Sequence, residues 1–405
     1  MIKHFGKISV ILVMLLLITA LTGCGNFLEN YDVIRTAHIA EPFERPTTES
    51  IIVASYDELV ETILDFIMDF RPGGLIHYHH YEDEDVYSQV EQAIYEIMNH
   101  HPVGAYVVEY ITAEPMVVVS YFEIEIEIEY KRTREQLDSI VQVASRRYLT
   151  SRLLRSMSTY DEEFVIRTNL QLTEEDIEEL VREVYYQNPG RIIMLPVVAV
   201  EFYPETGDER IYEIKFGHFE SPSIMQRYAA DLTTHIYHTA GRIYGDTDAE
   251  ILLAIVETLL DGAEFDLGTA NTISTHGTQN WAATAFGALM RGSAVGEGFA
   301  MAFKALSDEF RFDNRIVLGH RDGIVHAWNI VSLYGSFYHI DIAMISIYGL
   351  ETAFLRTDED FEEMLYQWDR VYTVRADGEL TLDDVLPPDD PYYEEGYDGE
   401  TDDEE

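Results

Sequence analysis

The sequence predicts an α+β protein in which two similar α+β modules are followed by a larger domain. Three observations support this fold class. A helical pattern that ends in proline occurs twice, the run "EIEIEIEY" alternates as strands do, and helices precede a group of strands in the C-terminal third. Helices and strands grouped in this way usually form sheets that are covered by helices.

The N-terminal segment has the composition of an export signal. Lys3 and Lys7 form a basic start, and "ISVILVMLLLITAL" is an apolar run that is short for a membrane span. The run ends in "LTGC", which resembles the bacterial lipobox. We therefore expect residues 1–23 to be a lipoprotein signal peptide and Cys24 to carry diacylglycerol. An ordinary cleaved signal or a signal anchor is the alternative.

This interpretation predicts a protein that is anchored by lipid to the extracytoplasmic face of the cell membrane. Cys24 is the only cysteine, so its acylation leaves the mature chain without a thiol for catalysis, metal binding or a disulfide. The net charge of −47 disfavours nucleic acid as a partner and favours cationic ones, although solubility alone also accounts for it. We expect no cofactor.

Residues 24–50 have no clear periodicity and are predicted to be a tether, and the modules follow at 51–145 and 146–230. "VEQAIYEIMNHHP", which starts at Val90, matches "IEELVREVYYQNP", which starts at Ile177. The apolar spacing in both predicts an amphipathic helix that the proline ends. Two strands are expected after each helix, and "EIEIEIEY" should bury one face and expose its glutamates.

The tract "LIHYHHYEDED" in the first module is a possible metal site. We expect His77 and His79 on one strand face and His80 on the other. Histidine-rich tracts can bind metal ions, but polar contacts between strands are the better explanation of this one. We therefore predict no metal site.

The third domain is predicted to span residues 231–376. Two amphipathic helices come first, then a loop rich in Gly, Thr, Ser and Asn, and then the segment "WAATAFGALMRGSAVGEGFAMAFKALSDEF". The strands "NRIVLGH", "GIVHAWNIVSLYG" and "SFYHIDIAM" complete it. The acidic segment 377–405, which shows no helical or strand period, is predicted to be a disordered tail.

Three motifs in this domain, "RGSAVGEGFAMAF", "HAWN" and "FYHID", resemble the bacterial transglutaminase-like domain, which belongs to the papain-like Cys-His-Asp superfamily. The resemblance covers about residues 243–375. It implies that His326 stands at the position of the base and Asp341 at that of the residue that orients it. It also implies that Gly296 stands where the family has its nucleophilic cysteine. In the family, that thiolate is favoured by a helix N-terminus and a neighbouring imidazolium.

The resemblance also implies roles for two residues after His326. Trp328 is expected to pack beside the cleft and Asn329 to make a structural hydrogen bond, and both are candidates for ligand binding. The family usually has Val-Thr-Trp-Asp after its aspartate, where this chain has Ala343 and Met344. Two losses in one cleft indicate relaxed catalytic constraint.

Three functions remain open on the sequence. The first is binding of a peptide or a cell-surface polymer by a cleft that has lost its nucleophile. The second is an active hydrolase or acyltransferase that uses Ser293 or Glu297 together with His326 and Asp341. The third is a structural scaffold on the cell surface. A metal site built from His320, His326 and His339 is not favoured, because strand spacing puts only some of them on one face.

Overall fold

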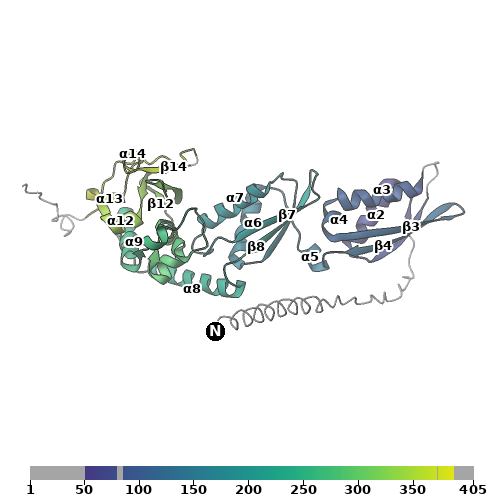
Figure 1. The fold of residues 1–405 in the computed structure, drawn as a ribbon, viewed down its shortest axis with the longest axis horizontal. Helices are drawn as coiled ribbons and strands as arrows, with labels where there is room; N and C mark the ends of the chain where they lie inside the picture. The colour runs from purple at the N-terminus through teal and green to yellow at the C-terminus, as the bar shows by residue number, and fades with distance from the viewer. Residues whose placement is uncertain (1–50, 80–84, 372, 387–405) are drawn as a thin grey trace, which may run out of the picture.

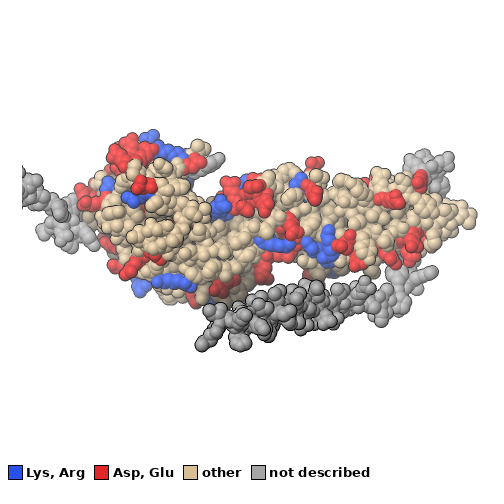
Figure 2. Space-filling model, viewed as in Figure 1, with Lys and Arg blue, Asp and Glu red and all other residues tan. Residues whose placement is uncertain are grey.

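The structure is a computed structural model that describes residues 51–79, 85–371 and 373–386. It is a mixed α+β protein with several small sheets, arranged as two modules and a third domain along one axis (Figure 1). The predicted signal peptide, Cys24 and the tether lie outside the described residues. No helix within those ranges is both long and apolar enough to cross a membrane. Acidic side chains are scattered over all three units on the face drawn in Figure 2.

The first module is a four-stranded sheet in the order β1-β2-β4-β3. Its α2 and α3 pack against each other, and Ile124, Ile126 and Ile128 of β4 are buried, as the alternation predicts. His79 stacks on the ring of Tyr121, and His77 packs against the same ring in a tilted arrangement. The elements are β1 (Ile51–Val53), α2 (Tyr56–Met68), β2 (Gly73–Tyr78), α3 (Val86–Asn99), α4 (Pro102–Val107), β3 (Val108–Val118), β4 (Tyr121–Tyr130) and α5 (Arg134–Asp138).

The second module repeats this topology with the strand order β5-β6-β8-β7. It begins at Val141 and not at residue 146 as the sequence suggested, because β5 pairs in parallel with β6. A three-residue strand is too short to show a period in the sequence. The elements are β5 (Val141–Val143), α6 (Arg146–Thr159), β6 (Glu163–Thr168), α7 (Glu174–Gln187), β7 (Val197–Tyr203) and β8 (Arg210–Gly217).

The third domain combines helices with a sheet in the order β13-β12-β11-β14. The helical part consists of α8 (Pro222–Ala240), α9 (Asp248–Gly262), α10 (Leu267–Ala270), a 3-10 turn (Trp281–Ala283), a π-helical turn (Gly287–Arg291) and α11 (Gly296–Glu309). β9 (Glu264–Phe265) pairs with β10 (Ser293–Ala294). The rest is β11 (Asn314–Arg321), β12 (Ile324–Leu333), β13 (Ser336–Ile340), α12 (Ile342–Tyr348), α13 (Leu350–Ala353), α14 (Asp358–Glu363), β14 (Tyr366–Trp368) and a 3-10 turn (Leu382–Asp384).

Both predicted limits of the third domain need correction. The expected start at residue 231 falls inside α8, which is continuous from Pro222 and packs mainly on this domain. At the other end, residues 377–386 pack on the domain, whereas we expected the disordered tail to start at residue 377. Val385 and Leu386 are buried in the core, and the Leu380 N–H donates to the Tyr338 hydroxyl. Isolated apolar residues in an acidic segment give no periodic signal, so only the packing reveals them.

Helix α11 is the centre of the third domain. It contacts helices α8, α9 and α12 as well as strands β11 and β12. Most of its residues are buried, including Phe299, Met301 and Phe303. Neighbouring backbone lies so close to the first turn of this helix that a small residue is required there. A β-carbon at Gly298 would lie 2.1 Å from the carbonyl oxygen of Ala282. The N-terminus of this helix is therefore fixed in a packed environment, and the pocket described next opens there.

Candidate functional site

A pocket of about 170 Å³ lies at the N-terminus of α11. One wall comes from the loop before the 3-10 turn at Trp281, a second from β11 and β12, and a third from α12. The lining residues are mainly apolar, with a few polar groups among them. Those polar groups are Asn271, His276, Glu297, Arg321, His326 and Tyr348.

His326 and Asp341 form a close pair at this pocket. The imidazole is on β12, and Asp341 directly follows β13, which pairs with β12. We expected the aspartate on the strand itself, but it is the N-cap of α12. The Nε2–H of His326 donates to Oδ2 of Asp341 over 2.6 Å, since an ionised carboxylate can only accept. Sequence reasoning therefore paired the correct two residues.

Asp341 is held by three donors although it is 1% exposed. Besides His326, the Tyr366 hydroxyl donates to Oδ2 over 2.6 Å and the Met344 N–H donates to Oδ1 over 3.1 Å. Burial alone would raise the pKa of this carboxyl. The charge of His326 and the three hydrogen bonds outweigh burial and lower its pKa below 3.8. Asp341 is therefore an anion that fixes the ring of His326.

Gly296 faces the other side of that ring. A β-carbon at this position would lie 2.5 Å from Cε1 and 2.6 Å from Nδ1 of His326. The ring thus occupies the space that a side chain would need. Nδ1 points toward the helix N-terminus and has no hydrogen-bond partner among the described residues. His326 and Asp341 are paired, and position 296 presents no side chain to the free face of the His326 ring.

Ser293 and Glu297, the two candidates to replace the missing cysteine, have different surroundings. Ser293 does not line the pocket, and its hydroxyl lies 3.4 Å from Oδ2 of Asp266. Glu297 does line it, but its carboxylate is bonded by Tyr186 and by the backbone of Gly277, not by His326. Neither side chain is hydrogen-bonded to His326, as a nucleophile activated by that histidine would be.

Trp328 and Asn329, which we expected to be candidates for ligand binding, lie outside the lining of the pocket. Both are 1% exposed. The Asn329 amide makes the expected structural hydrogen bonds, donating to the carbonyl oxygen of Ala300 (3.0 Å) and to Oδ1 of Asn314 (2.9 Å). Trp328 lies behind His326, with ring centres 6.3 Å apart. Residues next to each other on a strand point to opposite faces, and in this sheet both faces are covered.

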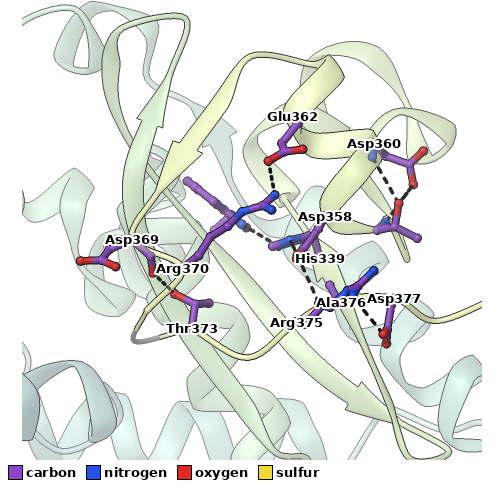
Figure 3. Close-up of polar contacts among 12 residues, drawn as sticks. His339, Asp358, Asp360, Glu362, Asp369, Arg370, Thr373, Arg375, Ala376 and Asp377 are labelled. Atoms are coloured by element: carbon purple, nitrogen blue, oxygen red, sulfur yellow. Dashed lines mark hydrogen bonds and ion pairs between the residues drawn. The ribbon is translucent and has the colours of Figure 1, made fainter.

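A second histidine–aspartate pair, whose histidine is fully buried, was missed by sequence reasoning (Figure 3). His339 on β13 is fully buried, and its Nε2–H donates to Oδ1 of Asp358 over 2.9 Å. Its Nδ1 accepts from the indole N–H of Trp328 at 2.9 Å. The Ala376 N–H also donates to Asp358, which ties the end of the domain to this cluster. No local pattern marks Asp358, because the capping box at the start of α14 is formed by Thr357 and Asp360.

The electrostatics of this buried pair favour a neutral ring. Burial lowers the pKa of His339 below 6.5, although its hydrogen bond to Asp358 opposes the shift. The indole N–H is a donor only, so Nδ1 must be unprotonated to accept from it. Among the described residues no three His, Cys, Asp or Glu side chains are arranged to hold a metal ion. His320, exposed on β11, joins neither pair.

Comparisons with known proteins give only distant likenesses. No protein-family model matches the chain, and no curated protein matches it. A transglutaminase crystal structure is 12% identical, with a TM-score of 0.25, over 54% of this chain and 60% of the other. A candidate cysteine protease from Cytophaga hutchinsonii is 14% identical, with a TM-score of 0.23, over 36% of this chain and 62% of the other. The chain thus spans less than two thirds of either protein, and these weak likenesses say nothing about activity.

Proposed function

We propose that this protein is a lipid-anchored extracytoplasmic protein whose third domain binds a peptide or a cell-surface polymer without cleaving it. The observation that carries the proposal is the pocket at Gly296, where the His326–Asp341 pair is present and a glycine stands at the position of the family's nucleophile. The transglutaminase-like motifs in the sequence add the expectation of an extended ligand.

Binding without catalysis is physically reasonable for such a site. Affinity for a ligand comes from many contacts, whereas a nucleophile contributes mainly in the transition state. The pocket keeps an apolar lining, which includes Phe265, Ile324 and Met344, beside its polar groups. Such a mixture suits ligands that combine aliphatic and polar parts.

A binding screen tests the proposal. The mature protein is titrated with peptides and cell-wall fragments, and Ile347→Arg is compared with Val371→Arg. Both residues are exposed and apolar, at 45% and 85%, but only Ile347 lines the pocket. We expect Ile347→Arg to weaken binding at least tenfold and Val371→Arg to leave it unchanged. Equal effects of the two, or no ligand at all, would favour the scaffold hypothesis.

The hydrolase or acyltransferase hypothesis has its own test. A nucleophile-directed covalent probe should label a serine or glutamate in the pocket if Ser293 or Glu297 is active. The contacts of these two side chains to Asp266 and Tyr186 lead us to expect no labelling.

Anchoring at Cys24 is tested separately. We expect the protein to partition with membranes, and Cys24→Ala to accumulate as an unprocessed precursor or a released form. Mass spectrometry of the mature N-terminus reads the modification directly, and an unmodified residue there would end this part of the proposal.

A further inference from the structure

The β3–β4 hairpin of the first module ends in an exposed apolar turn. The two strands are joined by a two-residue loop, Val119–Ser120. Met116 and Val117 are exposed just before this loop, and Val119 is fully exposed within it. Apolar side chains that gather on a solvated surface in this way are unfavourable unless something covers them, and they mark contact sites for proteins or membranes.

Local turn chemistry does not account for these residues. Two-residue hairpin loops favour Gly, Asn and Asp, which tolerate a positive φ, whereas Val119 is β-branched and has a φ of 21°. The second module has the ordinary alternative at the same place in its fold. Its β7–β8 hairpin turns through the polar segment 204–209, "PETGDE", in which Gly207 takes the positive φ. The apolar turn is therefore particular to the first module and is not required by the repeated topology.

The turn lies at one end of the molecule, and the third domain lies at the other (Figure 1). On the face drawn in Figure 2, the described residues at the outermost part of that end carry no charge. The described chain also begins near this end. Ile51 is level with Ile76 of β2 and hence with Ile124 of β4, about 13 Å along the strand from the turn. The chain from Cys24 to Ile51 can span at most about 90 Å, so a lipid on Cys24 keeps the turn within reach of the membrane surface.

We propose that the β3–β4 turn inserts into the lipid surface to which the chain is anchored and is a second membrane contact beside the anchor. This inference rests on the proposed anchoring at Cys24. A protruding apolar turn suits a lipid surface because burial of apolar side chains is non-directional, whereas a protein partner needs a complementary hollow. In this orientation the first module contacts the membrane, and the third domain with its pocket is directed away from it.

The residues behind the turn set the depth of insertion. Tyr121 directly follows the loop, and its ring packs against His77 and His79. Aromatic side chains of this kind are favoured at the level of the lipid headgroups. The Glu123 carboxylate follows, 3.4 Å from Nε2 of His77 and about 10 Å along the strand from the loop. Because a carboxylate is costly in hydrocarbon, insertion stops before Glu123, at a depth that is usual for interfacial segments.

The experiment couples the mature chain to lipid through Cys24. Because Cys24 is the only cysteine, the chain from residue 24 onward reacts at a single position with a maleimide lipid in phosphatidylcholine vesicles. Coupling is needed because so small a turn binds lipid weakly by itself, and the tether raises its effective concentration at the surface. Val119→Trp is the reporter, and its quenching by brominated phosphatidylcholine measures contact with the acyl chains.

We expect brominated lipid to reduce the Val119→Trp emission at least twofold after subtraction of the wild-type signal, whose tryptophans all lie in the third domain. Val197→Trp is the control, since Val197 is an exposed valine on the edge strand of the second module, and its emission should not change. Val117→Asp should abolish the quenching of Val119→Trp, because a carboxylate opposes insertion. Val197→Asp should leave it intact; Val117 and Val197 are 68% and 62% exposed, so thermal unfolding should be unchanged in both variants.

Two outcomes would overturn the membrane contact. One is quenching of Val119→Trp no greater than that of Val197→Trp. The other is a blue shift of the Val119→Trp emission that grows with protein concentration in the absence of vesicles, since a second copy of the chain then covers the turn. Chemical coupling makes the result independent of acylation in the cell. An unmodified Cys24 in the native protein would remove the anchor and leave the measured lipid contact, whereas an acylated Cys24 without quenching would keep the anchor and remove the contact of the turn.

Discussion

The two histidine–aspartate pairs of the third domain have the same chemistry and different surroundings. In the pair at the pocket, Nε2 of His326 bonds Asp341, and Nδ1 has no hydrogen-bond partner within the described part of the chain. In the buried pair, both nitrogens of His339 are used, by Asp358 and by the Trp328 indole. A histidine beside a carboxylate is therefore not by itself a functional site. What distinguishes the two is a ring nitrogen that is left free and faces a cavity.

The largest effect should come from breaking the buried pair. We expect His339→Ala to lower the free energy of unfolding by about 3 kcal/mol, because it leaves a cavity, an unpaired Trp328 indole N–H and an Asp358 carboxylate that keeps only the Ala376 N–H. Urea denaturation measures the loss, with His320→Ala as the exposed control, which should stay within about 0.5 kcal/mol of the wild type. A loss no greater than that of the control would show that the His339 contacts contribute little.

Breaking the pocket pair should affect ligand binding more than stability. His326→Ala leaves Asp341 with its hydrogen bonds from Tyr366 and Met344, so we expect a loss of only about 1–2 kcal/mol. Binding of the ligand found in the screen should nevertheless fall at least tenfold, whereas a folded His339 variant should keep it. If both variants lose binding equally, the comparison between the pairs fails.

Placing a side chain at position 296 should lower the stability by an intermediate amount. We expect Gly296→Cys to cost about 1 kcal/mol, because overpacking against His326 exceeds the gain in helix propensity. Gly262→Ala is the matched control, since a β-carbon there meets nothing within 4 Å, and it should be neutral or stabilising.

The same variant reports on the geometry of the site. With His326 adjacent, the new thiol should react with iodoacetamide faster than a model thiol near neutral pH, and His326→Ala should remove the acceleration. Equal, slow labelling in both backgrounds would mean that the Cys-His-Asp arrangement cannot be restored.

The smallest effect is the pH dependence of stability. The pKa of folded His339 lies below its unfolded value of 6.5, so the unfolded chain binds more protons between the two values. The contribution of neutral His339 to the free energy of unfolding is complete above pH 6.5. It declines as the pH falls toward the folded pKa, by no more than about 1.4 kcal/mol per pH unit. Urea unfolding at pH 5.5 and 7.5 should show a smaller difference for His339→Gln than for the wild type. An identical difference would mean that His339 titrates normally.

Much of the local structure was determined by the sequence itself. The helix periods before Pro102 and Pro189 and the alternation in "EIEIEIEY" appear in the structure as expected. These signals are local, because side-chain direction repeats every 3.6 residues in a helix and every two in a strand. The motif order also identified the pairing of His326 with Asp341 and the glycine that faces them.

The tertiary structure determined the burial and the long-range contacts that no local sequence pattern predicts. Among His320, His326 and His339, only packing determines which ring is exposed, which faces the pocket and which is buried. It also buries Trp328 and brings Tyr186 of the second module to Glu297. Such contacts join residues far apart in sequence, and their energies depend on burial and on the partners that burial leaves available. The residue types were fixed by the chain, but the function each can serve was fixed by its surroundings.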